Sequence, residues 1–126
     1  MAVQAIAKDV RMSPRKVAVV AALVRGRTVA DALTILEHTP RRSALPVLKV
    51  VASAKANAEH NHNLKPDTLR IIEISVSHGS RLQRFRPAAH GRANPFVRRS
   101  SHIRVVVDGE LRETKKPVKE VKKETK

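Results

Sequence analysis

The sequence predicts an α+β protein: a small body of three helices packed on a short antiparallel sheet, a long protruding β-hairpin and a flexible basic C-terminal tail. Three observations predict this class. Apolar residues recur at helical spacing between residues 13 and 60. They alternate with polar residues most regularly around residues 72–76 and 103–107. Between those two stretches lie 26 residues, 77–102, with too few apolar side chains to form a core.

The first predicted elements are a strand and a helix. Segment Val3–Val10 alternates loosely, which predicts a short strand. Ser13 and Pro14 are typical of a helix start, an N-cap followed by proline at the first helical position. Gly26 is placed to end this helix. Its apolar face consists of Val17, Val20, Ala21 and Val24.

Two more helices follow. Thr28 and Asp31 resemble a capping box that starts the second helix. Thr39 and Pro40 repeat the cap-and-proline pattern and predict a third helix ending near residue 60. Pro46 then falls in its first turns, so we expect it to kink them or to delay the true start. The inward residues are Ala32, Leu33 and Leu36 in the second helix and Leu45, Leu48, Val51 and Ala52 in the third.

The two stretches of alternation predict strands that are joined by segment 77–102. The simplest geometry for that segment is one long β-ribbon that leaves the body. Gly79 is expected to form a bulge, and the turn is placed between Arg86 and Asn94. The residues that interrupt the ladder there are Pro87, Gly91 and Pro95. In the strands, Ile72, Ile74 and Val76 share one face, and so do Ile103, Val105 and Val107.

Charge is distributed unevenly along a chain whose formal net charge is +15. Residues 74–107 contain seven Arg, no Lys and no acidic residue. A charge run is usually a solvated face, but solvated surfaces mix both signs, so this acid-free block predicts a polyanionic partner. Arg suits phosphate because its planar guanidinium donates two parallel hydrogen bonds. The sequence therefore predicts that the ribbon binds nucleic acid.

Composition excludes several other classes. Without Cys, the chain has no disulfide, thiolate zinc site or Cys nucleophile. No apolar run is long enough for a membrane span, and the first ten residues lack the apolar stretch of a signal peptide, so we expect a cytoplasmic protein. His60 and His62 have only Glu59 and Asp67 nearby as further ligands, which favours a solvated helix end over a metal site.

Catalysis is not expected either. The acid-free block offers no carboxylate for acid–base or metal chemistry, and the four Gly, at positions 26, 79, 91 and 109, are too scattered for a phosphate-binding loop. We therefore expect no enzyme and no cofactor. Two alternatives to an RNA-binding protein remain: a dimeric DNA-bending protein with basic β-arms, and a nuclease, which the missing carboxylates disfavour. Basic residues near the helix ends suit contact with the sugar-phosphate backbone of a nucleic acid. They are Arg15, Lys16, Arg25, Arg27, Arg41 and Arg42.

Phe85 and Phe96 flank the predicted turn. We expect them to pack against each other across the ribbon, with insertion between bases as the alternative. His90 and His102 also lie in the Arg-rich segment. For these two histidines, simple exposure and contact with phosphate or base are both open.

Four ordered motifs resemble the bacterial-type large-subunit ribosomal protein twenty-two family. They are Val10–Val17, Leu23–Gly26, Ser53–Asn61, and Gly91–Ala93 followed by Ser101–Val107. The match runs from about Ala2 to Asp108. It implies one domain over residues 1–110 that includes hairpin 77–102, while 111–126 is expected to be a disordered basic tail.

The resemblance also implies a function. It suggests a structural constituent of the large ribosomal subunit that binds 23S-type rRNA, aids its assembly and lines the nascent-peptide exit tunnel with its hairpin. Expected partners are neighbouring large-subunit proteins, including the other tunnel-constriction protein, and the nascent peptide, with the protein itself a monomer in the ribosome.

Charge and resemblance together define the candidate interface. The expected RNA-binding residues are Arg11, Arg15, Lys16, Arg25, Arg27, Asn57, His60, Asn61, Arg81, Arg84, Arg86, His90, Arg92, Arg98, Arg99, His102 and Arg104. The expected tunnel-lining tip is Leu82, Gln83, Arg84, Phe85, Arg86, Pro87, Ala88, Ala89, His90, Gly91, Arg92 and Ala93.

Overall fold

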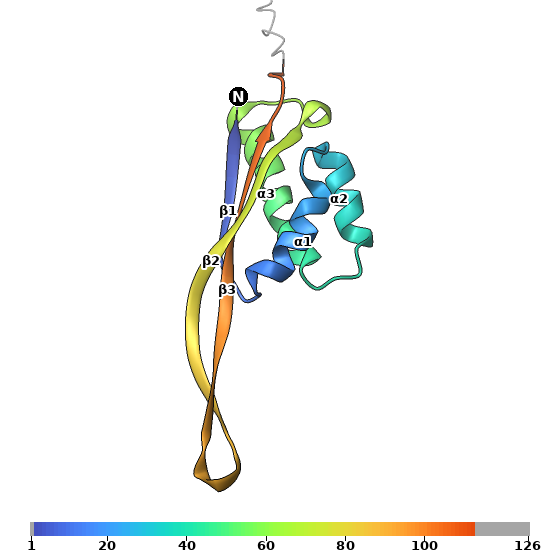
Figure 1. Ribbon diagram of the computed structural model, residues 1–126. Coiled ribbons are helices and arrows are strands. Elements are labelled where there is room, and N and C mark those ends of the chain that lie inside the picture. The colour runs from blue at the N-terminus through green and yellow to red at the C-terminus, as the bar shows by residue number, and fades with distance from the viewer. Residues whose placement is uncertain (1, 113–126) are drawn as a thin grey trace, which may run out of the picture.

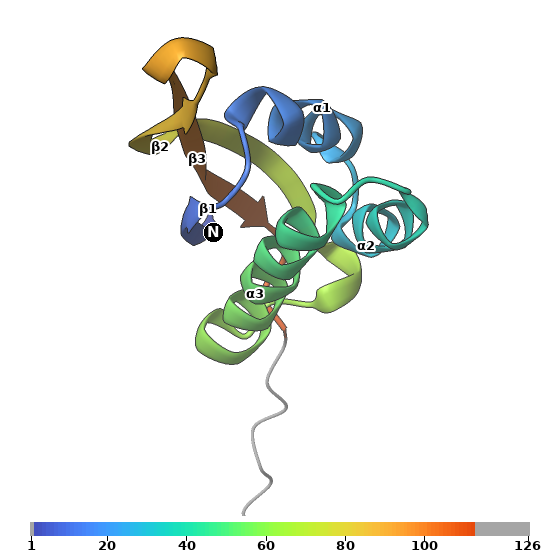
Figure 2. The same ribbon diagram turned by 90° about the horizontal axis from the view of Figure 1, so that it is seen from below.

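The computed structural model describes residues 2–112 and confirms the predicted fold class. Three helices cover one face of a three-stranded antiparallel sheet whose strand order is β1-β3-β2 (Figure 2). The elements are β1 (Val3–Val10), α1 (Pro14–Val24), α2 (Val29–His38), α3 (Ala44–His62), β2 (Arg70–Pro87) and β3 (Ala93–Asp108). From residue 113 onward, the predicted tail lies outside the described residues.

β2 and β3 form one continuous antiparallel ladder that is much longer than the body (Figure 1). Their pairing runs from Arg70 opposite Asp108 to Pro87 opposite Ala93. The helices cover only the part of the ladder near the chain ends, and the rest projects from the body. No residue from 81 to 99 is buried. The predicted ribbon is therefore present, with its turn where the sequence places it.

Local sequence signals account for the starts of α1 and α2. Ser13 occupies the N-cap of α1 with Pro14 in the first turn, although the Ser13 side chain makes no capping hydrogen bond. At α2, the Thr28 hydroxyl oxygen accepts from the Asp31 backbone N–H at 3.2 Å. This bond satisfies one of the N–H groups that every helix start leaves without an intrahelical partner.

The start predicted for α3 at Thr39 and Pro40 is wrong. α3 begins at Ala44, after a loop, and Pro46 is its third residue. The expectation that Pro46 delays the helix start is confirmed. Proline is tolerated there because the first N–H groups of a helix have no intrahelical acceptor in any case. Asn63, with a φ of 49°, ends the helix in the left-handed conformation.

The core lies between the helices and the inner face of the sheet, and it corrects part of the prediction for α3. Leu45 is 59 % exposed and Ala52 is also exposed, whereas Val51 is fully buried. The buried stripe of α3 consists of Ala44, Val47, Val50, Val51, Ala54 and Ala58. These small residues let the helix approach the sheet closely, so the larger Leu45 lies on the outer side.

A β-bulge in β2 overturns the predicted inward position of Ile72. Pairing with β3 shifts register between Ile71 and Glu73, so that Ile71 and Ile74 are each 1 % exposed while Ile72 is 56 % exposed. A bulge adds one residue to a strand and so reverses the alternation of its faces. On β3, by contrast, Ile103, Val105 and Val107 are all fully buried as predicted.

The loop between α1 and α2 covers the outer edge of β2 within the body. The Gly26 N–H donates to the Ile71 carbonyl at 3.1 Å, and the Ile71 N–H donates to the Arg27 carbonyl at 2.9 Å. The Val29 N–H donates to the Leu69 carbonyl at 2.9 Å. These bonds occupy backbone groups that would otherwise pair with another chain. The α1–α2 loop therefore covers this edge of the sheet.

We predict that the bulge separates the energetic roles of two neighbouring isoleucines. Ile74→Ala leaves a cavity in the core and should lower the free energy of unfolding by about 2–4 kcal/mol. Ile72→Ala, the matched control, removes the same atoms from the surface and should cost less than about 0.5 kcal/mol. Urea denaturation of the two variants measures both values. Equal losses would show that β2 alternates regularly and has no bulge at this position.

Candidate nucleic-acid interface

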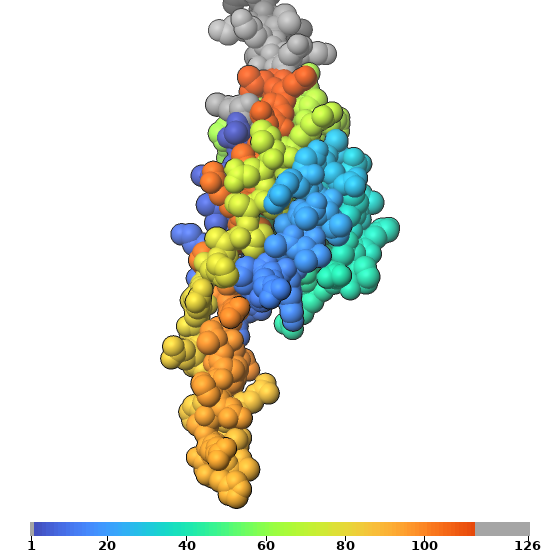
Figure 3. Space-filling view, in the orientation of Figure 1, coloured from blue at the N-terminus to red at the C-terminus, as the bar shows by residue number. Residues whose placement is uncertain are grey.

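The hairpin presents Arg side chains on both of its faces. Because directly opposite residues share a face, the register defines two sets of side chains. One face carries the pairs Arg81–Arg99, Gln83–Val97 and Phe85–Pro95; the other carries Leu82–Arg98, Arg84–Phe96 and Arg86–Asn94. All of the Arg residues in these pairs are exposed. In the space-filling view the hairpin is a narrow column of side chains with no other element beside it (Figure 3).

The predicted packing of Phe85 against Phe96 is wrong. Phe96 lies opposite Arg84 and Phe85 lies opposite Pro95, so the two rings are on opposite faces of the ribbon. The guanidinium carbon of Arg86 instead lies 5.0 Å from the centre of the Phe96 ring, a cation–π contact. Phe85 is 67 % exposed. Its ring is therefore free for contact with another molecule.

The turn of the hairpin is compact and built from small residues. The Ala88 N–H donates to the Arg92 carbonyl at 2.7 Å and closes the turn around a short 3₁₀ segment, Ala89–Gly91. His90 and Gly91 adopt positive φ angles of 58° and 68°. His90 and Arg92 are both exposed. The predicted tip is thus a small loop with two basic side chains on its surface.

A network of polar side chains ties the root of the hairpin to β1. The Asp9 Oδ1 accepts from the Ser80 N–H at 3.3 Å and from the Ser80 hydroxyl at 3.0 Å. The Ser100 hydroxyl lies 3.3 Å from the same oxygen and donates to the Ser80 carbonyl at 2.8 Å. A Cβ atom at Gly79 would lie 2.6 Å from the Ser100 Oγ, so only glycine permits this close approach. The predicted Gly79 bulge is confirmed by the register shift between His78 and Arg81.

His102 and Asp9 complete this root network. The Asp9 N–H donates to the His102 Nδ1 at 2.9 Å, from a residue whose φ of 52° marks the bulge in β1. The Nδ1 atom of His102 is therefore occupied by a hydrogen bond within the protein, and only its Nε2 atom can contact a ligand. Hydrogen bonds from the Ser80 N–H and then the Ser80 hydroxyl lower the pKa of Asp9, with a smaller contribution from His102.

The candidate residues of the body fall into separate groups. Arg11, Arg15 and Lys16 are exposed near the start of α1, close to where the hairpin leaves the body. Asn57, His60 and Asn61 lie in the last turns of α3, at the other end of the body. The structure therefore does not bring these two groups together. Within residues 2–112, no three His, Asp or Glu side chains are grouped so as to hold a metal ion.

Two of the candidate arginines also stabilise the fold. An Nη of Arg25 donates to the Ile74 carbonyl at 3.2 Å, and the Arg27 Nε donates to the Leu23 carbonyl at 2.9 Å. Both guanidinium groups remain exposed and keep further N–H donors. They can therefore contact an anion in a fixed orientation.

Arg41 and Arg42 are absent from the predicted RNA-binding set, although they lie beside it in the structure. They line a hollow together with Arg11 and Lys16. Both are among the helix-end cations predicted to suit contact with a nucleic-acid backbone, and in the structure both side chains are exposed. Their proximity to Arg11 depends on how α1 and α3 pack, which spacing alone does not show.

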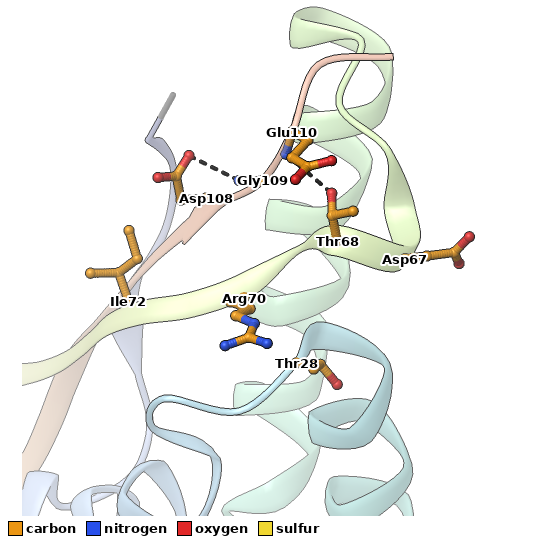
Figure 4. A pocket seen from close by; sticks show the side chains of 8 residues that line it. All are labelled: Thr28, Asp67, Thr68, Arg70, Ile72, Asp108, Gly109 and Glu110. Carbon is orange, nitrogen blue, oxygen red and sulfur yellow. Dashed lines mark hydrogen bonds between the residues drawn. The ribbon is translucent and has the colours of Figure 1, made fainter. Parts of the chain in front are cut away.

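Acidic residues gather at the end of the body opposite the hairpin. Asp67, Asp108 and Glu110 line an open pocket of about 650 Å³ with Arg70 among them (Figure 4). The Glu110 N–H donates to the Thr68 hydroxyl at 3.1 Å, and the Gly109 N–H donates to the Asp108 carboxylate at 2.9 Å. Within residues 2–112, the hairpin beyond its root therefore carries cations and no carboxylate, whereas this end of the body carries both signs. Such a distribution orients a protein as it approaches a polyanion.

Comparison with known proteins shows the family. The family model of ribosomal protein L22p/L17e matches residues 5–108. The chain is 52 % identical to the large ribosomal subunit protein uL22 of Clostridium novyi over 107 residues, which cover 85 % of this chain and 96 % of that protein. It is 50 % identical to uL22 of Oceanobacillus iheyensis over 107 residues, covering 85 % and 95 %. It is 46 % identical to uL22 of Herpetosiphon aurantiacus over 108 residues, covering 86 % and 96 %.

The chain belongs to the ribosomal protein L22p/L17e family. This confirms the resemblance seen in its motifs. The match to the L22p/L17e family spans the whole hairpin, the root network and every cation around the hollow. Members of this family are structural ribosomal proteins and not enzymes, and the relatives named above belong to the large subunit, which is cytoplasmic. No helix within residues 2–112 is long and apolar enough to cross a membrane.

We predict that the pKa of Asp9 is below the ordinary aspartate value and rises in Ser80→Ala, which removes one hydroxyl donor. Because folding lowers this pKa, the ionised carboxylate stabilises the root above the ordinary value, and this contribution disappears as the pH falls through the lowered value. Titration followed by carboxyl NMR measures the shift. Ser77→Ala, on an exposed serine of the same strand, is the control and should leave Asp9 unchanged. The same Asp9 pKa in wild type and Ser80→Ala would rule out the hydroxyl bond.

Proposed function

We propose that this protein is a structural constituent of the large ribosomal subunit that binds large-subunit rRNA and aids its assembly. One observation carries the proposal: from residue 81 to residue 99 the hairpin has no buried residue and no acidic residue, and it carries Arg on both faces. A two-stranded ribbon of this kind is marginally stable in water, and its like charges repel one another. It therefore fits a channel lined with phosphate on both sides.

Folded RNA supplies such a channel better than a DNA duplex does. A basic arm in a DNA groove meets phosphates on its flanks while one face stays in solvent, and DNA-bending proteins with such arms act as dimers. Here the β2 edge within the body is covered by the α1–α2 loop, which supports a monomer. Matching relatives are large ribosomal subunit proteins, which supports rRNA as the nucleic acid.

The hairpin tip is proposed to line the nascent-peptide exit tunnel. Small residues at the turn keep the tip narrow, while Arg92 gives it positive charge. Phe85, on one face behind the turn, offers an exposed ring to a neighbouring base or protein. In this proposal residues 1–110 act as one domain. Its partners are 23S-type rRNA, the other tunnel-constriction protein and the peptide in the tunnel.

We predict that shortening the hairpin separates assembly from tunnel function. Deleting 83–86 together with 94–97 removes four opposing pairs and keeps the root, the turn and the register, whereas a deletion in one strand alone would shift the pairing. Subunits should still incorporate this variant through the body, and their response to a stalling peptide or a tunnel-bound drug should change. The matched control is Arg70→Gln, which removes one exposed charge at the opposite end.

Two outcomes would contradict parts of this proposal. Failure of the shortened protein to enter the subunit, while the control enters normally, would make the tip an assembly anchor. Normal incorporation with every tunnel response unchanged would remove the tunnel assignment and leave rRNA binding in place.

A further inference from the structure

Asp9 lies at the point where the hairpin leaves the body. β1 pairs with β3 for the last time at Val10 and Ser101, and beyond this pair the sheet has only two strands. Figure 1 shows these two strands continuing alone past the end of β1. No residue from 81 to 99 is buried, so the core does not determine the direction of the hairpin past this level. The direction is therefore set at the root.

Two bulges meet at this level of the sheet. In β1 the register with β3 shifts between Ala7 and Val10, and in β2 it shifts between His78 and Arg81. A bulge bends its strand, increases the local twist and interrupts the regular ladder of hydrogen bonds that would otherwise fix the angle. The direction of the hairpin therefore depends on further contacts at the root.

Asp9 makes such contacts with both strands of the hairpin. Its Oδ1 accepts from the N–H and the hydroxyl of Ser80 on β2, at 3.3 and 3.0 Å. Its N–H donates to the His102 Nδ1 on β3 at 2.9 Å, and the Ser100 hydroxyl lies 3.3 Å from the same Oδ1. The two serines are joined as well, since their hydroxyl oxygens are 3.0 Å apart. One residue of β1 thus connects both hairpin strands to the body.

The conformation and the charge of Asp9 both indicate a specific role. Its φ of 52° lies in the left-handed region, which residues other than glycine seldom adopt and which Asn and Asp tolerate best. Its carboxylate is exposed beside a hairpin whose residues 81–99 contain basic side chains and no acidic one. A carboxylate in this position repels phosphate and so opposes the proposed binding of RNA. The hydrogen bonds that it accepts, and not a contact with RNA, therefore account for its position.

We propose that Asp9 is a positioning residue, which holds the hairpin in one direction relative to the body before RNA is bound. The inference rests on the proposed binding of rRNA and adds a requirement to it. A strand rises ~3.3 Å per residue, so the turn lies roughly 30 Å beyond the root, and a change of about 10° in direction moves it by roughly 5 Å. When the direction is fixed in advance, less conformational freedom is lost on binding.

Pairs of spin labels measure this direction in the free, full-length protein. The chain has no Cys, so Ala30→Cys on α2 and Ala89→Cys at the turn, both at exposed positions, give a single labelled pair. Asp9→Gly removes the carboxylate but permits the positive φ, and should broaden the distribution of distances between the labels by at least about twofold. Asp9→Asn keeps an acceptor oxygen and the preference for this φ, so its distribution should stay close to that of wild type.

Two further measurements separate the direction of the hairpin from other changes. A label pair at Gln83 and Ala89 lies within the hairpin and should have the same distribution in every variant. Broadening of this pair would place the change in the hairpin itself and contradict the proposal. Ser80→Ala removes one of the two Ser80 donors to Asp9, so it should broaden the Ala30–Ala89 distribution to an intermediate extent, and it provides the test from β2 if Asp9→Gly does not fold.

Equal widths of the Ala30–Ala89 distribution in wild type, Asp9→Gly and Ser80→Ala would overturn the proposal. Equal broadening in Asp9→Gly and Asp9→Asn would overturn it too, because the acceptor oxygen would then have no effect on the direction.

RNA binding supplies a second readout, in which the positioning role and simple electrostatics predict opposite signs. Removing a carboxylate near phosphate should strengthen binding, whereas losing a fixed direction should weaken it. We expect Asp9→Gly to bind an in vitro transcript of large-subunit rRNA about threefold to tenfold more weakly than wild type, with the same salt dependence because no cation is lost. Asp9→Asn and the matched control Glu37→Gln, which removes an exposed carboxylate of α2, should bind at least as tightly as wild type.

The two proposals fail in different ways. Wild-type binding that does not weaken as the salt concentration rises would overturn the electrostatic binding of rRNA, whatever the spin labels show. Normal, salt-dependent binding by wild type, with equal or tighter binding by Asp9→Gly, would overturn the positioning role of Asp9 and leave rRNA binding in place.

Discussion

The structure depends on a hairpin that has nothing of its own to pack against. From the Arg81–Arg99 pair to the turn, the two strands are held together by their ladder of hydrogen bonds and a few cross-strand contacts. The contact between Arg86 and Phe96 is one of these. Six arginines lie between residues 81 and 99, without a carboxylate in the same segment to offset them. Isolated two-stranded ribbons are marginal in water, so the free energy that fixes this one must come from its root and from whatever surrounds it.

The body supplies the root. Asp9 at the end of β1 joins Ser80 and Ser100 on the two hairpin strands, and the bulge at Gly79 allows the strands to approach closely enough for this network. Three helices pack on the sheet next to this root, and the α1–α2 loop covers its β2 edge. The acidic residues around Glu110 lie at the opposite end of the body, away from the Arg side chains of the hairpin.

Periodicity and caps predicted three helices, strands and the ribbon, because each depends on a local pattern, although the cap pattern at Thr39 placed the start of α3 too early. What they did not show depends on tertiary structure. The bulge that exposes Ile72 cannot be recognised from the alternation of apolar and polar residues. The placement of Phe85 and Phe96 on opposite faces of the ribbon follows from the strand register, which the turn determines. Likewise Arg41 joins Arg11 only because α1 and α3 pack together. Hydrophobicity favoured Leu45 for the core, whereas close packing selected its smaller neighbours.

Amide hydrogen exchange, measured on the full-length protein free and bound to large-subunit rRNA, tests the central claim most directly. If the hairpin has no core and is stabilised by the RNA around it, amides of residues 83–97 exchange quickly in the free protein, while those of Ile74, Ile103 and Val105 exchange slowly. Binding should then slow exchange in the hairpin by at least about tenfold and leave the core unchanged. Slow exchange in the free hairpin, or fast exchange that RNA does not alter, would contradict the account.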